Sequence, residues 1–131
     1  MKKFIIIFIL FHNSIYGSEI KFEKIFDNLD KPWSLSFIDK ENILITEKGG
    51  KLFTLNLINK ELIEINHNLS IISLGQGGLL DVLYKDKHVY ISYSEKRNNQ
   101  KTSTSVAKGP FNKKIINFKN LFRAEPPIKS G

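Results

Sequence analysis

Apolar and polar residues alternate along most of the chain, in short runs typical of β-strands. In "WSLSFID", Trp33, Leu35 and Phe37 fall on one face of an extended chain, and Ser34 and Ser36 on the other. Similar runs recur through the rest of the chain, separated by Gly, Asn and Asp residues. No segment carries a sustained apolar stripe with the 3.6-residue period of a helix. The pattern therefore predicts an all-β protein built as an antiparallel meander.

The turn positions group these runs into two rounds. Residues 33–65 contain three or four predicted strands, including a turn at Gly49-Gly50, and residues 79–122 contain four. Four-stranded units in series are typical of β-propeller blades. A β-sandwich stays open as an alternative, although its Greek-key crossovers usually need longer connections than these. Since two blades cannot close a ring, the pattern predicts part of a larger propeller.

The segment "GQGGLLD" contains three glycines around Gln76, and a strand-like run follows at once. Glycine is needed where the backbone turns at positive φ or comes close to another group. One interpretation is a tight turn into a buried strand, with Gln76 bonded only to backbone. The other is a turn that directs Gln76 toward a ligand. Without further information, the residues favour the first.

The amino terminus has the order of a secretory signal peptide. Lys2 and Lys3 precede an apolar run, Phe4–Phe11, which is followed by small and polar residues and is too short to span a bilayer. We predict that residues 1–18 are a signal peptide, that the protein is exported to the periplasm, and that no transmembrane segment remains after cleavage. A buried first strand is the alternative.

Composition and charge narrow the function classes. The chain is 41% hydrophobic and 25% charged, as in ordinary globular proteins, and the lack of cysteine excludes disulfides and thiolate chemistry. The net charge is +7, and residues 95–131 hold nine Lys or Arg against Glu95 and Glu125. These bases are spread along predicted strands, without the arginine and aromatic clustering of a nucleic-acid groove. We predict a solvated basic face and no nucleic-acid partner.

The residues alone indicate no catalytic or metal centre. The spacing of a phosphate-binding loop, of a metal-ligand cluster and of a nucleophile elbow is absent. Glu47 is interpreted as a turn residue and Asp81 as a hydrogen-bonding strand residue. The three histidines are interpreted as ordinary surface residues: His12, His67 and His88.

Four segments together resemble the soluble aldose sugar dehydrogenases of the glucose/sorbosone dehydrogenase family, which use pyrroloquinoline quinone (PQQ). In chain order they are "LDKPWSLSFIDKENILITEKGGKLFTL", "GQGGLLDVLYKDKHVYISYS", "TSTSVAKGPF" and "NLFRAEPPIKSG". The resemblance covers residues 19–131 and about the first third of a typical member. It implies that residues 19–131 are the N-terminal part of such a domain, about two four-stranded blades of a partial six-bladed β-propeller.

The resemblance also implies a chemistry. PQQ lies over the central channel with calcium nearby, and an aldose is oxidised at C1 to the lactone as hydride passes to the quinone. A histidine base takes the hydroxyl proton, and an external acceptor then takes the electrons. The glutamine of the family's glycine-rich segment lies near the sugar and cofactor, so this role carries over to Gln76. The resemblance thus reverses the preference stated above for Gln76.

The chain departs from the family pattern in two places. A longer loop commonly follows the strand at Leu79–Tyr84, where this chain has only "KDKH". The family's catalytic histidine, calcium ligands and basic cofactor contacts belong to segments that follow the position of Gly131. We therefore expect no catalytic residue and no metal ligand in these 131 residues, and no activity from them alone. A non-redox ligand- or partner-binding propeller is the alternative function, and a lactonase-type propeller is a lesser one.

Overall fold

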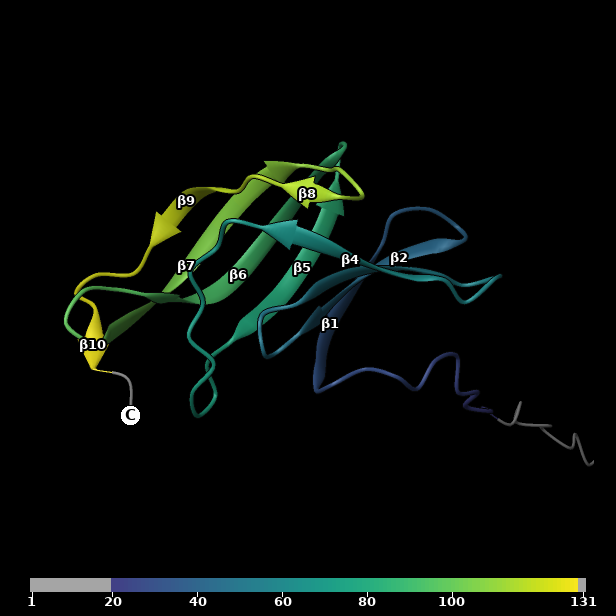
Figure 1. The fold of residues 1–131 in the computed structure, drawn as a ribbon, viewed down its shortest axis with the longest axis horizontal. Coiled ribbons are helices and arrows are strands. Elements are labelled where there is room, and N and C mark those ends of the chain that lie inside the picture. The colour runs from purple at the N-terminus through teal and green to yellow at the C-terminus, as the bar shows by residue number, and fades with distance from the viewer. Residues whose placement is uncertain (1–19, 130–131) are drawn as a thin grey trace, which may run out of the picture.

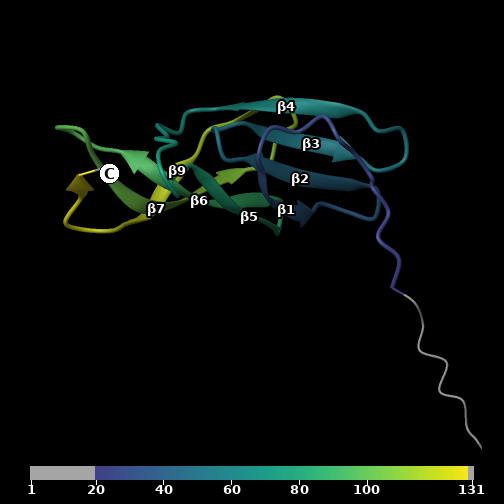
Figure 2. The same ribbon diagram turned by 90° about the horizontal axis from the view of Figure 1, so that it is seen from below.

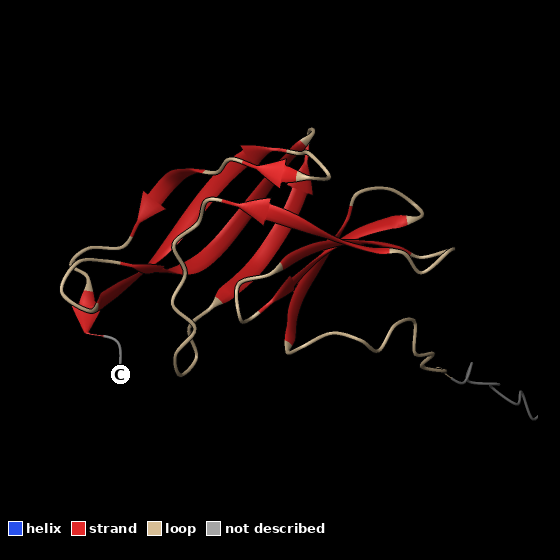
Figure 3. Ribbon diagram, viewed as in Figure 1, coloured by secondary structure: helices blue, strands red, loops and turns tan. Residues whose placement is uncertain are grey.

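The computed structural model describes residues 20–129 of the chain. Within that range all regular structure is β-strand, which confirms the all-β prediction (Figure 3). None of the described residues forms a helix long and apolar enough to cross a membrane. The predicted signal peptide, residues 1–18, lies outside the described residues and stays a prediction.

The first sheet contains five strands in the spatial order β1-β2-β3-β4-β8. Figure 1 shows β8 beside β4, and Figure 2 shows β1 to β4 in that order. Their bounds are β1 (Pro32–Phe37), β2 (Asn42–Glu47), β3 (Leu52–Asn56), β4 (Leu62–His67) and β8 (Ile115–Ile116). The expected turn at Gly49-Gly50 joins β2 to β3. Strands β1 to β4 pair antiparallel, whereas β8 pairs parallel with β4. The chain departs from a simple meander here, because β8 returns from the second sheet to the edge of the first.

The second sheet is formed by the other five strands. Their bounds are β5 (Leu79–Lys85), β6 (His88–Lys96), β7 (Lys101–Pro110), β9 (Lys119–Arg123) and β10 (Ile128–Lys129). Strands β5, β6 and β7 are neighbours in that order, and β7 pairs with both β9 and β10. The two predicted rounds of strands therefore correspond to β1–β4 and to β5–β7 with β9.

An apolar core lies between the two sheets. Leu44, Leu52 and Ile65 contribute from the first sheet, and Val89 and Ile91 from the second; none of the five is more than 1% exposed. Strands β1 and β5, from different sheets, lie side by side (Figure 2). This packing joins the sheets into one unit.

Hydroxyl groups of β1 join the sheets where β1 meets β5. Ser34 Oγ donates a hydrogen bond to Asp81 Oδ1. Ser36 Oγ accepts one from the backbone N–H of Tyr84 at 2.9 Å. Two adjacent strands of one sheet pair through backbone hydrogen bonds, whereas β1 bonds to β5 through these side chains. The polar face of β1 is therefore the internal one.

The apolar face of β1 points away from the second sheet. Trp33, Leu35 and Phe37 are 46%, 56% and 61% exposed. The residues of "WSLSFID" thus alternate between two faces, as the sequence predicts, but the apolar face is exposed. Nearby, Phe26 packs against the cluster of Ile43, Ile45 and Leu55.

Candidate functional site

The glycine-rich loop between β4 and β5 needs its glycines for two physical reasons. Gly75 has φ of +55°, a left-handed conformation that side chains disfavour. At Gly78, an added Cβ would lie 2.3 Å from the carbonyl oxygen of Lys48. At Gly77, it would lie 2.8 Å from Ser94 Oγ. One glycine therefore bends the loop, and the other two let it approach its neighbours.

Backbone hydrogen bonds tie this loop to both sheets. Leu79 N donates to the carbonyl oxygen of Lys48, in the β2–β3 turn, at 3.1 Å. On the other side, Ser94 N, near the end of β6, donates to the carbonyl oxygen of Gly78 at 2.8 Å. The loop is thus held between the first sheet and the second.

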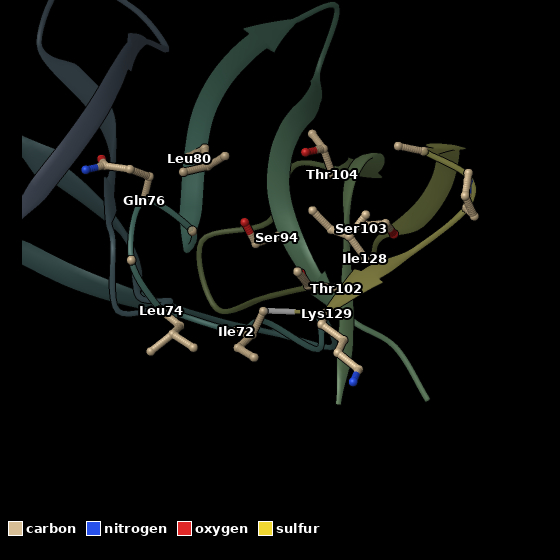
Figure 4. A pocket seen from close by; sticks show the side chains of 14 residues that line it. Ile72, Leu74, Gln76, Leu80, Ser94, Thr102, Ser103, Thr104, Ile128 and Lys129 are labelled. Atoms are coloured by element: carbon tan, nitrogen blue, oxygen red, sulfur yellow. The ribbon is translucent and has the colours of Figure 1, made fainter. Parts of the chain in front are cut away.

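Gln76 lies at the exposed turn of this loop. Its side chain extends to one side of the loop, away from Ser94 and Thr104 (Figure 4). Across residues 20–129, no hydrogen bond from the protein fixes its amide. The loop therefore presents an open amide, which can both donate to and accept from a ligand. The structure therefore does not show, among the residues it describes, the hydrogen bond from Gln76 to the backbone that the first interpretation of the sequence expected.

A hollow of about 490 Å³ lies beside the loop (Figure 4). Part of its lining is polar: Gly75 to Gly77, Ser94, Thr102, Ser103, Thr104 and Lys129. The rest is apolar: Ile72, Leu74, Leu80, Ala124, Pro126 and Ile128. Tyr93 packs in the core between the sheets, and successive side chains of a strand alternate, so Ser94 faces the opposite side. The hollow thus opens on the face of the second sheet that the first sheet does not cover. This mixed lining suits a small ligand that has both an apolar surface and polar oxygens.

A buried carboxylate fixes the end of β6 next to the loop. Glu95, 8% exposed, accepts hydrogen bonds from Arg123 Nε at 2.9 Å and from Ser105 Oγ at 2.7 Å. Burial acts to raise the pKa of Glu95, but those two bonds and the charges of Arg123 and Arg97 outweigh it and hold the pKa below its usual value. An ionised Glu95 therefore anchors the strand whose backbone holds Gly78.

The two carboxylates discussed from the sequence have structural roles and do not form a pair. Glu47, 5% exposed, accepts a hydrogen bond from Asp30 N at 2.6 Å. Asp81 accepts the bond from Ser34 and another from Val82 N at 3.0 Å. Asp81 is a hydrogen-bonding strand residue, as interpreted from the sequence. Glu47, interpreted as a turn residue, is instead the buried last residue of β2, and its carboxylate holds the backbone that precedes β1.

The histidines that the structure describes lie outside the hollow. His67 Nε2 is 2.7 Å from the carbonyl oxygen of Gly50, and its ring meets that of Phe118 edge-on. His88 Nδ1 is 2.8 Å from the carbonyl oxygen of Asp86. His12 lies outside the described residues. Over residues 20–129, no group of three or more His, Asp or Glu side chains could hold a metal ion.

Sequence reasoning missed one lysine and one ion pair near the site. Lys48 was given no role from the sequence, yet its Nζ donates to the carbonyl oxygen of Gly75. Glu95 and Arg123 are 28 positions apart, and no local pattern marks their ion pair. Both depend on which segments lie together in space.

Comparisons with known proteins cover most of the chain. The sequence model of a family described as glucose/sorbosone dehydrogenase matches residues 29–131. The chain is 31% identical over 121 residues to the aldose sugar dehydrogenase YliI of Escherichia coli, covering 86% of this chain and 33% of that protein. A crystal structure described as glucose dehydrogenase matches with a TM-score of 0.76 and 32% identity, over 83% of this chain and 34% of the other.

A more distant structure shares the fold. It is the PQQ-bound aldose sugar dehydrogenase of Streptomyces coelicolor, 15% identical, with a TM-score of 0.69 over 79% of this chain and 33% of the other. Together these likenesses confirm the fold prediction: the two sheets are blades of a partial β-propeller. The chain spans about a third of the length of the proteins it matches.

Proposed function

The chain belongs to the glucose/sorbosone dehydrogenase family, and on this basis we propose that it forms two blades of a PQQ-dependent aldose sugar dehydrogenase. The substrate would be an aldose oxidised at C1 to the lactone, and an external acceptor would take the electrons. The observation that carries the proposal is the open amide of Gln76, presented by a loop that is tied to both blades. We also propose export to the periplasm, on the basis of the lysines and the apolar run at the amino terminus.

The residues beside Gln76 fit part of a PQQ molecule, which is flat and carries several carboxylates. A volume of about 490 Å³ is within the usual range for small-molecule sites. The hydroxyl groups of Ser94 and Thr104 suit its oxygens, and the apolar side chains of the lining suit its flat ring system. When bound, PQQ supplies the two-electron acceptor for the sugar. We propose that its other contacts, and calcium, are held by parts of the enzyme outside residues 20–129.

Gln76 would bind and orient the sugar. Its carbonyl oxygen can accept a hydrogen bond from a sugar hydroxyl while its NH₂ group donates to a neighbouring oxygen. Neither His67 nor His88 lines the hollow, so we assign the proton acceptor to no residue in the described part of the chain. A general base contributes about 10²–10⁴-fold. We therefore expect these 131 residues alone to reduce no dye above the rate of free PQQ.

A chimaera provides the direct test of this function. Residues 29–131 would replace the matching segment of the Escherichia coli aldose sugar dehydrogenase, and dye-linked oxidation of aldoses would be measured with PQQ and calcium. We expect turnover from the chimaera, and a loss of kcat/KM of about tenfold or more in its Gln76→Ala variant, as for loss of a hydrogen bond to substrate.

Circular dichroism and thermal melting provide the control that both chimaeras are folded. A folded chimaera that binds an aldose but does not oxidise it would contradict the proposal and favour the non-redox binding propeller. Equal kcat/KM with and without the Gln76 side chain would contradict the role given to Gln76.

A further inference from the structure

We propose that Lys48 is a positioning residue, which fixes the glycine-rich loop so that Gln76 meets its ligand in one orientation. The inference rests on the function proposed for Gln76. Across residues 20–129, no hydrogen bond holds the Gln76 side chain, so its position depends on how the backbone of its loop is held. Lys48 contacts that backbone on both sides of Gln76.

The main chain of Lys48 holds the residues that follow Gln76. Its carbonyl oxygen accepts the hydrogen bond from Leu79 N at 3.1 Å. Gly78 packs against the same carbonyl group, and a Cβ there would also lie 2.8 Å from Lys48 Cγ. Lys48 is itself fixed, because its N–H donates to the carbonyl oxygen of Lys31 at 3.0 Å. The downstream half of the loop therefore lies directly on Lys48.

The side chain of Lys48 holds the residue that precedes Gln76. Its Nζ donates a charge-assisted hydrogen bond to the carbonyl oxygen of Gly75, the bent position of the loop. The same ammonium lies 5.6 Å from the centre of the Trp33 ring, a favourable cation–π distance. One ammonium therefore connects β1, the β2–β3 turn and the loop.

A variant that lacks only the Lys48 ammonium can distinguish a role in positioning the loop from a role in the stability of the whole fold. Removing the ammonium while keeping the aliphatic stem should loosen the loop and leave the core between the sheets intact. Lys48→Met does this, and Lys48→Arg restores a donor and a charge. Lys51→Met is the matched control, because exposed Lys51 lies in the same turn and undergoes the same change of charge.

Amide hydrogen exchange, measured by NMR on the full chain, tests the structural half of the proposal. In Lys48→Met we expect exchange at Gly77 and Leu79 to accelerate about tenfold, as for loss of a charged hydrogen bond. Exchange at Ile91, in the core, should be unchanged. Lys48→Arg should return the loop to near its original rate, and Lys51→Met should leave it unaltered. An unchanged loop in Lys48→Met, or equal acceleration at Ile91, would overturn the proposal.

Kinetics in the chimaera test the link to the ligand. We expect Lys48→Met to raise KM for the aldose several-fold more than it lowers kcat, with rescue by Lys48→Arg; unchanged KM would overturn the link. Gln76→Ala should raise KM without changing the exchange of the loop. If Lys48→Met loosens the loop but Gln76→Ala leaves kinetics unchanged, the positioning of the loop stands and the proposed function of Gln76 fails.

Discussion

Two glycine-containing turns contact each other through Lys48, and they use glycine differently. In the β2–β3 turn, a Cβ added at Gly49 would meet nothing within 4 Å. In the loop before β5, a Cβ at Gly78 would lie 2.3 Å from the carbonyl oxygen of Lys48. The first turn reverses the chain and leaves space at Gly49, whereas the second is closed onto its neighbours and presents Gln76. A pair of glycines in a sequence therefore does not indicate by itself whether they only reverse the chain or allow it to pack closely against a neighbouring segment.

The largest effect that separates the two turns is expected from Gly78→Ala. The new methyl group would overlap the backbone of Lys48, which cannot rotate away, so the loop or the β2–β3 turn must shift. We expect a loss of about 3 kcal/mol in the free energy of unfolding, measured by urea denaturation. A loss smaller than about 1 kcal/mol would mean that the loop is not closed onto Lys48 in solution.

A smaller effect is expected from Gly77→Ala. Here the nearest atom is Ser94 Oγ at 2.8 Å, the end of a side chain that can rotate, although Leu74 O lies 3.1 Å away. We expect a loss of about 1 kcal/mol. A double-mutant cycle with Ser94→Gly should recover part of it, and a fully additive cycle would show that Ser94 does not limit the loop.

Lowering the pH should loosen the glycine-rich loop before β5 more than the β2–β3 turn. The pKa of Glu95 is lowered in the folded protein, so its stabilising contribution is complete above the ordinary glutamate value of about 4.3 and is lost as pH falls through the folded value. Glu95 anchors the end of β6, which holds Gly78. As the pH falls and Glu95 becomes protonated, amide exchange near Gly78 should therefore accelerate more than exchange at Gly50. Both rates are first corrected for the intrinsic pH dependence of amide exchange. Glu95→Gln should abolish the difference; an unchanged pH response would contradict the assignment.

The smallest effect is expected from Gly49→Ala. Its Cβ would enter open space, and its φ is not in the left-handed region, so we expect a change within about 0.5 kcal/mol in either direction. Thermal melting of the Gly49→Ala and Gly78→Ala variants side by side compares the two turns directly. A large loss at Gly49 would remove the distinction between the two turns.

Local pattern was enough to predict most of the fold. Period-two alternation and turn residues predicted the strands of both blades, because each strand is short and its turn chemistry is local. They could not predict which face of β1 is internal. The serines of β1 face β5 because Ser34 and Ser36 bond to it, while Leu35 stays open. The parallel return of β8 to β4 depends on long-range packing and left no local signal.

The site was predicted only in part, for the same reason. Glycine content marked the loop, and a family resemblance marked Gln76. The contacts that hold the loop come from Lys48 and Ser94, which are distant in sequence from Gln76 and have ordinary neighbours in the chain. Spacing cannot identify such partners before the two sheets are packed together.

Centrally, we propose that the glycine-rich loop presents the Gln76 amide to a sugar. The most direct measurement is the NMR signal of the Gln76 side-chain NH₂ group in the PQQ-loaded chimaera during titration with an aldose. Asn117, which lines a separate hollow with His88 and Lys108, serves as an internal control. We predict a saturable shift at Gln76 and none at Asn117. A Gln76 signal that stays unmoved while the sugar is bound or oxidised would contradict the account.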